Sequence, residues 1–347
     1  MANFPPFSCP GKAKYPAIEE AEEAVSRPLS AALLAVFDAT LVHVLNTVAA
    51  GHNADWQKIR KDMCAALNDK KHERTAAILE STTYADCDVI FLQESSATFK
   101  AFAEGRALGE AYDFLAPENA DPNRDQNSLV LLRKASAWGP ATDASAAIAD
   151  ALAAKAKADG LKSPAAPGDV AAFETSLAGK PFLLASFHGD TNGLATAPVL
   201  DALDAYKRKE SDDAVLLFGL DANVYGAEAE GKYFVGDFAA HFGGLGLSDV
   251  YGRNPDPKTY TTFNARTYLQ PQLNKAVKPE DKFTSPLVDR NPKDHILFYE
   301  KDAKLAAPPT RDNTGRGFYD NDIMFPTLTF PSDHAITKAA VALVAAD

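Results

Sequence analysis

The sequence predicts an α/β fold, and three observations lead to that prediction. Short apolar runs of strand length recur along most of the 347 residues. Helix-spaced or irregular segments separate most of these runs, and most runs end at or near Asn, Glu, His or Asp. Strand ends that carry polar side chains are typical of a scaffold that builds its functional site there. A chain of this length forms one large domain or about two smaller ones.

The individual elements follow from the spacing of apolar residues. Apolar side chains at helical spacing predict helices over about 26–38, 55–67 and 72–82. Continuous apolar or β-branched runs predict buried strands. These strands are Leu41–Asn46, Asp88–Glu94, Ser128–Leu132, Pro181–Phe187, Ala214–Leu220 and His295–Tyr299.

The chain is expected to divide into an N-terminal extension with a helix, residues 1–40, and a single domain over 41–347. Three insertions are expected within that domain. An alanine-rich segment near 135–178 predicts an added helix and turn, and long irregular stretches near 255–291 and 304–329 are candidate rims of a substrate cleft.

Composition excludes several classes of protein. Asp plus Glu is 47 against 35 for Lys plus Arg, so the net charge of −12 argues against a protein that lives mainly on long polyanions. The three cysteines are too scattered for a disulfide framework and predict reduced thiols and a cytoplasmic location. The apolar run Leu29–Phe37 is interpreted as a helix packed on the core and not as a targeting segment. No apolar run approaches the length of a membrane span, which needs about 18 residues.

Chemistry-bearing side chains gather at the ends of the predicted strands. They are Glu94, then His188 and Asp190, then Asp221 and Asn223, and finally Asp333 and His334 after a proline turn. Taken alone, Glu94 is a solvated turn residue and His188 a structural histidine more often than not. Jointly they supply carboxylates for a hard cation such as Mg²⁺ and an imidazole of suitable pKa to act as a base.

The order of these segments resembles that of a known family. The segments that carry the resemblance are Asn46, Phe91-Leu92-Gln93-Glu94, the His188 strand, Gly219-Leu220-Asp221-Ala222-Asn223, Lys293-Asp294-His295-Ile296-Leu297 and Ser332-Asp333-His334. They resemble the endonuclease/exonuclease/phosphatase superfamily, which includes DNase-I-like nucleases, abasic-site endonucleases, deadenylases, inositol polyphosphate 5-phosphatases and neutral sphingomyelinases. The resemblance covers the chain from about residue 41 onward.

The resemblance implies a four-layer α/β/β/α sandwich, in which helices flank two mostly antiparallel sheets, and a Mg²⁺ or Mn²⁺ cofactor. It further implies these roles: Glu94, Asn46 and Asp333 at the metal; His334 as the base that activates water, oriented by Asp294; Asp221 and Asn223 positioning nucleophile and phosphate; and His188 bonding a phosphoryl oxygen.

Some residues depart from the family pattern or keep two interpretations. Leu220 adds an apolar residue between Gly219 and Asp221, which leaves the Asp-x-Asn pair intact. Asp190 and Asn192 are either additional substrate-binding residues or turn formers. His295 follows Asp294 directly on a strand, so its side chain should point to the opposite face of the sheet. We therefore expect His295 to be structural.

The expected activity is hydrolysis of a phosphodiester or phosphomonoester, with a small molecule, lipid head group or short nucleic acid as substrate. Arg266 lies in a segment rich in amides and hydroxyls, 262–275, that either reads the substrate or caps the sandwich edge. No obligate protein partner is evident. A catalytically silent binding relative, or metal-hydroxide chemistry on a non-phosphate substrate, are the alternatives.

Overall fold

The computed structural model describes residues 64–118, 126–158, 164–265 and 288–344, together with individual positions elsewhere, among them Arg124 and scattered residues from Val25 to Asp62. The chain divides into two compact units, Met1–Asp62 and Met63–Asp347. Each unit is considered by itself below.

The described positions of the first unit correct one prediction. Val42 and His43 are helical, so the predicted strand over 41–46 is wrong at these positions. The Thr47 hydroxyl donates to the carbonyl of His43 at 2.8 Å, a helical i−4 contact that β-branched residues tolerate. The helical positions Leu29 and Leu33 are exposed within this unit, and packing of this segment on the core stays a prediction.

The second unit contains one large sheet with the order β4-β5-β6-β7-β11-β8. Its strands are β4 (Thr142–Asp143), β5 (Val170–Leu177), β6 (Lys180–His188), β7 (Val215–Asp221), β8 (Leu247–Asp249) and β11 (Asp294–Tyr299). Strands β6 and β7 pair in parallel, whereas the other neighbours pair antiparallel.

A second, three-stranded sheet has the order β1-β3-β2 and is antiparallel throughout. Its strands are β1 (Val89–Ser95), β2 (Tyr112–Leu115) and β3 (Asn127–Arg133). Three antiparallel pairs complete the strands: β9 (Asn264–Ala265) with β10 (Val288–Asp289), β12 (Ala303–Leu305) with β15 (Val341–Leu343), and β13 (Thr310–Asp312) with β14 (Ile336–Lys338).

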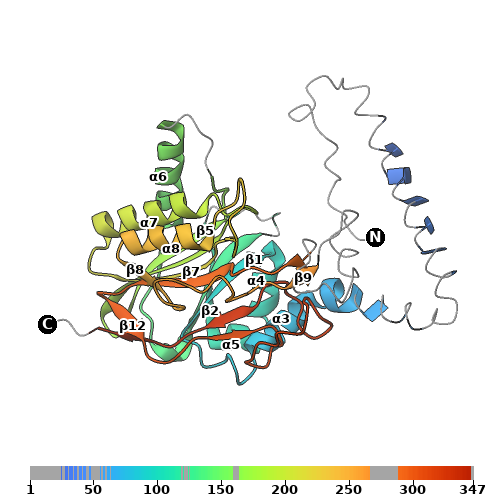
Figure 1. Cartoon of the computed structure of the whole chain (residues 1–347). Coiled ribbons are helices and arrows are strands. Elements are labelled where there is room, and N and C mark those ends of the chain that lie inside the picture. The colour runs from blue at the N-terminus through green and yellow to red at the C-terminus, as the bar shows by residue number, and fades with distance from the viewer. Residues whose placement is uncertain are drawn as a thin grey trace. The chain divides into compact units, whose positions relative to one another are not determined.

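The helices fall into two groups, which Figure 1 shows on opposite sides of the sheets. One group comprises α6 (Ser145–Ala158), α7 (Thr196–Glu210) and α8 (Val235–Gly244), and the other comprises α3 (Lys71–Leu79), α4 (Ala97–Glu104) and α5 (Ala107–Ala111). A π-helical turn at Ala65–Asp69 precedes α3, and a 3₁₀ turn at Lys134–Ser136 follows β3. Among the described residues, no helix combines the length and the apolar character needed to cross a bilayer.

Three apolar clusters show how these layers stack. The first joins α6, α7 and α8 to one face of the large sheet, the second lies between the two sheets, and the third joins the small sheet to α3, α4 and α5. Strand alternation produces this arrangement, because Leu183 of β6 faces the helices while Leu184 faces the other sheet. The predicted four-layer α/β/β/α sandwich is therefore confirmed.

Gly219 lies two residues before Asp221, at a point where the two sheets come close together. A Cβ at this position of β7 would lie 2.4 Å from Cδ2 of Phe91 on β1, so glycine lets the two sheets approach. The side-chain amide of Gln93 bridges the same gap, donating to Ser186 Oγ at 2.9 Å and to the carbonyl of Gly219 at 3.3 Å. Leu220 continues the strand, and Asp221 is the last residue of β7.

The three expected insertions differ in their outcome. The 135–178 segment contains the expected helix, α6, but it also contains β5, a strand paired along its length with β6 in the large sheet. That strand is part of the scaffold, and its hydrogen bonds to β6 override the alanine-rich composition that suggested decoration. Most of the 255–291 segment, residues 266–287, lies outside the described part, and the 304–329 segment contributes β13.

Candidate functional site

Three neighbouring strands place the first site residues side by side. His188 pairs with Asp221 in the parallel ladder of β6 and β7, and Asp221 pairs with Asp294 in the antiparallel ladder of β7 and β11. Paired residues of adjacent strands project to the same face of a sheet. Nε2 of His188 accordingly lies 3.7 Å from Oδ2 of Asp221.

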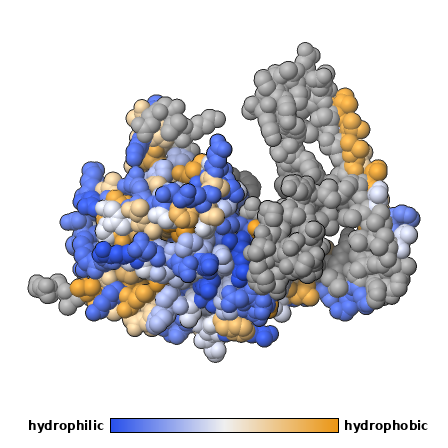
Figure 2. All heavy atoms as spheres, viewed as in Figure 1, coloured by the Kyte–Doolittle hydropathy of each residue, from blue (hydrophilic) through white to orange (hydrophobic). Residues whose placement is uncertain are grey.

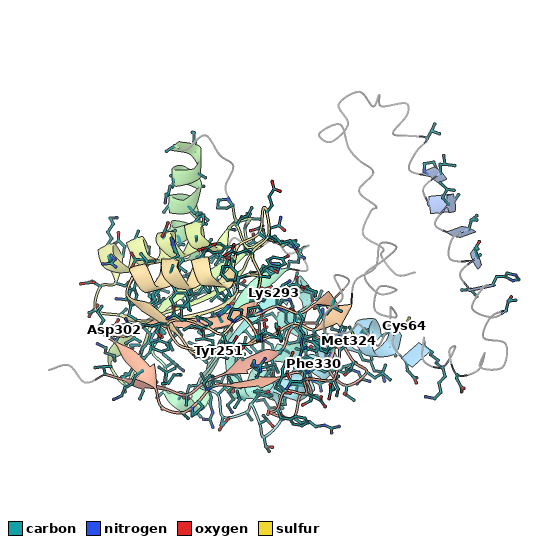
Figure 3. All side chains as sticks on the ribbon, viewed as in Figure 1. Cys64, Tyr251, Lys293, Asp302, Met324 and Phe330 are labelled. Atoms are coloured by element: carbon teal, nitrogen blue, oxygen red, sulfur yellow. The ribbon has the colours of Figure 1, made fainter. Side chains whose placement is uncertain are left out.

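His334 reaches this row from the C-terminal loop. Its Nδ1 donates to Asp294, at 3.1 Å from Oδ1 and 3.0 Å from Oδ2, while its Nε2 lies 3.8 Å from Oδ2 of Asp221. A bridge with Thr262 and a hydrogen bond from the His334 amide to Ser332 Oγ hold the loop. Phe330, labelled in Figure 3, anchors the loop in an apolar cluster of its own.

Glu94 comes to the same place from the other sheet, at the end of β1. Its backbone is left-handed, with φ of 50°, and the register of β1 against β3 shifts between Leu92 and Ser95. Left-handed backbone is uncommon for a residue with a side chain and concentrates at functional sites. The Glu94 carboxylate lies 3.3 Å from Nε2 of His188. This hydrogen bond lowers the pKa of Glu94 to about 2, against the opposing effect of burial.

Asn223 also adopts a left-handed backbone, with φ of 50°. Its main-chain amide donates to Oδ1 of Asp221 at 2.9 Å. Its side-chain amide donates to the carbonyl of Gly189 at 2.9 Å and to Oδ2 of Asp221 at 3.3 Å. Asn favours this conformation more than most residues do. Asn223 therefore fixes the Asp221 carboxylate and links the ends of β6 and β7.

Several carboxylates crowd around His188 and His334, and they shift the pKa values of the site residues. Burial and the neighbouring Asp294 raise the pKa of Asp221, although His334 opposes them. Burial lowers the pKa of His334, but Asp294 and Asp221 outweigh it and raise that pKa well above the ordinary value. The pKa of His188 is raised in the same way by Glu94 and Asp221 against burial. The carboxylates around the two imidazoles therefore favour their protonated forms.

These residues line one cleft of about 360 Å³. Its lining consists of Glu94, Arg124, Gln126, Pro164, Asp169, His188, Gly189, Asp190, Thr191, Asp221, Asn223, Lys293, Asp333 and His334. A cleft of this size accommodates a nucleotide-sized ligand. Asp333, which the resemblance places at the metal, is exposed and also lines the cleft.

The remaining predicted residues differ in position. Asp190 lines the cleft, yet its carboxylate also accepts hydrogen bonds from the main-chain amides of Asn192 and Ala195, so it forms the turn before α7. Asn192 is exposed and is not part of the cleft lining. Asn46 and Arg266 lie outside the described residues. His295 is buried on the other face of β11, where it bonds to Asp249 and the carbonyl of Pro292.

Two cations of the cleft were not assigned a role from the sequence. Lys293 (Figure 3) is buried with its Nζ 3.2 Å from Oδ2 of Asp289, and Asp289 and Asp221 raise its pKa against the effect of burial. Arg124 pairs with Asp169 and donates to the carbonyl of Pro167 at 2.7 Å. Lys293 stands beside Asp294 in the motif that carries the resemblance, and that position was the available signal. Arg124 lies in a loop, where its positive charge was the available signal.

Two separate groups of donors in the site could hold a divalent cation, one around Asp221 and the other around Glu94. Carboxylate oxygens of Asp221 and Asp294 and a nitrogen of His334 all lie within 4.8 Å of one another. The Glu94 side chain is 45% exposed and opens to the same cleft. Oxygen-rich, partly open sites of this kind suit Mg²⁺ or Mn²⁺, which retain waters for substrate oxygens.

Comparisons with known proteins give similarities for both units. Residues 9–61 match a family described as a domain of unknown function (DUF8234). No curated protein sequence matches the chain. Similar solved structures include TDP2 of D. rerio complexed with single strand DNA product, with 17% identity, a TM-score of 0.48, and coverage of 79% of this chain and 93% of that chain.

Two further solved structures are similar to a comparable degree. The human Nocturnin catalytic domain with bound sulfate anion has 16% identity and a TM-score of 0.48, covering 81% of this chain and 91% of that chain. The endonuclease domain of TRAS1, a telomere-specific non-LTR retrotransposon, has 13% identity and a TM-score of 0.46, covering 79% and 93%. All three belong to the DNase-I-like endonuclease/exonuclease/phosphatase superfamily.

Proposed function

We propose that the chain is a member of the endonuclease/exonuclease/phosphatase superfamily and a divalent-metal-dependent phosphoesterase that hydrolyses a phosphodiester or phosphomonoester. The observation that carries the proposal is the convergence of Glu94, His188, Asp221 and His334, from two sheets and the C-terminal loop, on one cleft, with Asp294 bonded to His334. The particular ester bond is part of the proposal and is decided by loops around the cleft.

The cofactor is Mg²⁺ or Mn²⁺, held by Glu94 and Asp333 together with Asn46. When bound, such a cation offsets the charge of phosphate and carboxylates and acidifies a water. The fit rests on the acidic lining of the cleft, which repels a phosphate ester as it stands.

His334 acts as the base. Because Nδ1 donates to Asp294, Nε2 is the nitrogen that accepts a proton from the attacking water. The same carboxylates that orient the ring also raise its pKa, so offsetting their charge favours the neutral ring that can accept a proton. Asp294 is thus a positioning residue whose charge also stabilises the imidazolium as it forms.

The remaining residues bind and orient the ester. Asp221 and Asn223, fixed to each other by two hydrogen bonds, position water and scissile phosphate. His188 carries a raised pKa and so supplies a cationic donor to a phosphoryl oxygen. Asp190, Asn192 and Arg266 complete the proposed substrate contacts.

The test is turnover of bis-p-nitrophenyl phosphate in Mn²⁺ by the wild type, by Glu94→Ala and by His334→Ala. His241→Ala is the matched control, because His241 lies on α8 and bonds to Asp201 on α7. We expect both site variants to lose at least about 10²-fold in kcat while the control keeps wild-type turnover. Equal turnover in all four proteins rejects the proposal. It is also rejected if the wild type hydrolyses no ester in a panel of phosphodiesters, inositol phosphates, lipids and nucleic acids.

A further inference from the structure

Lys293 is a charged residue that is buried and yet lines the cleft (Figure 3). Figure 2 shows hydrophilic residues over much of the visible surface of the second unit, where water solvates them. The Lys293 side chain, in contrast, is only 6% exposed. Lysine is almost never buried to this degree unless its ammonium group has a partner. The roles proposed above include the neighbouring Asp294 but give Lys293 none.

The main chain of Lys293 is fixed beside the Asp-x-Asn turn. Its amide donates to Oγ1 of Thr261 at 2.9 Å, and its carbonyl accepts a hydrogen bond from the amide of Ala222 at 2.8 Å. Ala222 is the residue between Asp221 and Asn223, the pair proposed to position water and phosphate. Lys293 therefore stands at the same edge of the large sheet as that pair.

Two groups hold the ammonium group of Lys293 in place. Its Nζ donates to Oδ2 of Asp289 at 3.2 Å, and the centroid of the Tyr225 ring lies 5.6 Å from Nζ. Asp289 is itself fixed, because its other oxygen accepts a hydrogen bond from the side-chain amide of Asn291. The Tyr225 hydroxyl donates to the carbonyl of Thr191 at 2.9 Å. These contacts limit the movement of the ammonium group, and the ion pair favours its charged form.

The ammonium group has more hydrogen-bonding capacity than Asp289 uses. An ammonium group carries three N–H donors and no acceptor. In the described part of the chain, Asp289 is the one hydrogen-bond acceptor of Nζ. Lys293 lines the cleft, whereas Asp289 does not. Donors therefore remain for a ligand in the cleft, and hydrogen bonds from an ammonium group to an anionic oxygen are among the strong ones.

A fixed positive charge matters in this cleft because the lining is acidic. The lining contains five carboxylates, Glu94 and Asp221 among them, and these repel an anionic ester. Arg124 also lines the cleft, but it is paired with Asp169, which is another residue of the lining. The carboxylate partner of Lys293 lies outside the lining. Lys293 therefore adds a positive charge to the cleft that no carboxylate of its own pair cancels there.

We propose that Lys293 is a further substrate-binding residue, whose ammonium group donates to a non-bridging oxygen of the phosphate group beside Asp221 and Asn223. This inference rests on the proposed phosphoesterase function, since it names a contact within the same site. The contact places a positive charge against the negative charge of the phosphate oxygens. Inorganic phosphate presents the same kind of oxygen, so it probes the contact without any turnover.

Isothermal titration calorimetry of the full chain with inorganic phosphate, in saturating Mg²⁺, tests the proposal. Lys293→Met removes the ammonium group and keeps an unbranched apolar side chain, so we expect the dissociation constant of phosphate to rise at least about tenfold. Loss of a positive charge favours a bound cation, so this weakening does not come from loss of Mg²⁺.

Lys207→Met is the matched control for loss of a buried lysine. The Lys207 side chain is 2% exposed and its Nζ lies 3.8 Å from Oδ2 of Asp302, but Lys207 lies on α7 and does not line the cleft. This variant should bind phosphate like the wild type. Equal weakening in Lys207→Met and Lys293→Met would show a general loss of structure and would overturn the proposal.

Two further variants separate a direct contact from an effect of charge at a distance. Asp289→Asn removes the carboxylate that competes for the ammonium group, so phosphate should bind more tightly than in the wild type. Lys293→Met/Asp289→Asn has the net charge of the wild type, yet it should still bind phosphate at least about tenfold more weakly. The double variant leaves no unpaired charge in the interior, so it tests the contact even if Lys293→Met alone does not fold.

Wild-type phosphate affinity in the double variant overturns the proposal, and so does a wild type that binds no phosphate in Mg²⁺. Turnover of bis-p-nitrophenyl phosphate distinguishes this failure from failure of the proposed function. If the wild type hydrolyses the ester while the double variant binds phosphate normally, only the Lys293 contact is rejected. If the wild type hydrolyses no ester while the double variant loses phosphate affinity, the phosphoesterase is rejected and Lys293 is supported as an anion-binding residue.

Discussion

The Nδ1 atom of His334 donates into the carboxylate of Asp294, 3.1 and 3.0 Å from its two oxygens. The two residues lie 40 positions apart in sequence. The contact decides which nitrogen of the ring faces the cleft, because a carboxylate accepts but does not donate a hydrogen bond when ionised.

Replacing Asp294 with Asn should therefore impair catalysis more than binding. The amide no longer stabilises a proton on Nδ1 and an imidazolium, so we expect kcat to fall about 10²–10⁴-fold with KM changed by less than about threefold. Steady-state kinetics and the pH dependence of kcat measure this. Asp201→Asn is the control, because Asp201 contacts His241, a half-buried histidine that does not line the cleft. A loss confined to KM would show that Asp294 binds substrate and does not position His334.

Removal of divalent cations should abolish turnover. The carboxylates of the cleft repel phosphate, so exhaustive dialysis against EDTA is expected to reduce turnover to below about 1%. Addition of Mg²⁺ or Mn²⁺ should restore it, whereas Ca²⁺ of larger radius should restore less. Full turnover in EDTA, with the metal content verified by mass spectrometry, would contradict the metal assignment.

The pair of His295 and Asp249 predicts a pH-dependent stability. Both side chains are buried, Nδ1 of His295 lies 2.7 Å from Oδ2 of Asp249, and Asp249 raises the pKa of His295 against the effect of burial. A raised folded-state pKa stabilises the fold below about pH 6.5, and this contribution is lost as pH rises through the folded-state value. Asp249→Asn should cost about 3–5 kcal/mol at pH 6 and less at higher pH.

Urea unfolding of both proteins between pH 6 and 9 measures this difference. His188 and His334 also have raised pKa values, but they contribute equally to both proteins and cancel in the difference. A difference that is constant with pH, or that grows as pH rises, would show that His295 is neutral in the folded state.

Gly219 should be intolerant of a side chain. A Cβ there would meet the Phe91 ring at 2.4 Å, so we expect Gly219→Ala to destabilise the fold by about 1–3 kcal/mol. Gly243→Ala in α8 is the control, because its Cβ would meet nothing within 4 Å and alanine favours the helix. The double variant Gly219→Ala/Phe91→Leu should recover part of the loss, as measured by chemical unfolding, and a fully additive loss would place the strain elsewhere.

The strands of the sandwich could be predicted because buried strands are read as continuous apolar runs. The runs around Phe91, Leu184, Phe218 and Leu297 all became strands. The run from Leu41 failed at Val42 and His43, because a short apolar run does not distinguish a buried strand from an apolar helix.

The site was predictable where strand register alone brings residues together. His188, Asp221 and Asp294 occupy paired positions on adjacent strands, so their convergence follows from the strands themselves. The left-handed backbone of Glu94 was not predictable, because no local signal marks a non-glycine residue for that conformation. The position of Arg124 in the cleft was not predictable either, because it enters from a loop whose path strand register does not fix.

The most direct measurement is a crystal structure of the chain soaked in Mn²⁺ with a phosphate ester analogue, with anomalous diffraction recorded at the Mn edge. The account predicts an anomalous peak at coordination distance from the Glu94 carboxylate, with His334 Nε2 free of the ion and facing the phosphorus through a water. A peak whose ligands are Asp221, Asp294 and His334, with Glu94 uninvolved, would make His334 a metal ligand and contradict its role as the base.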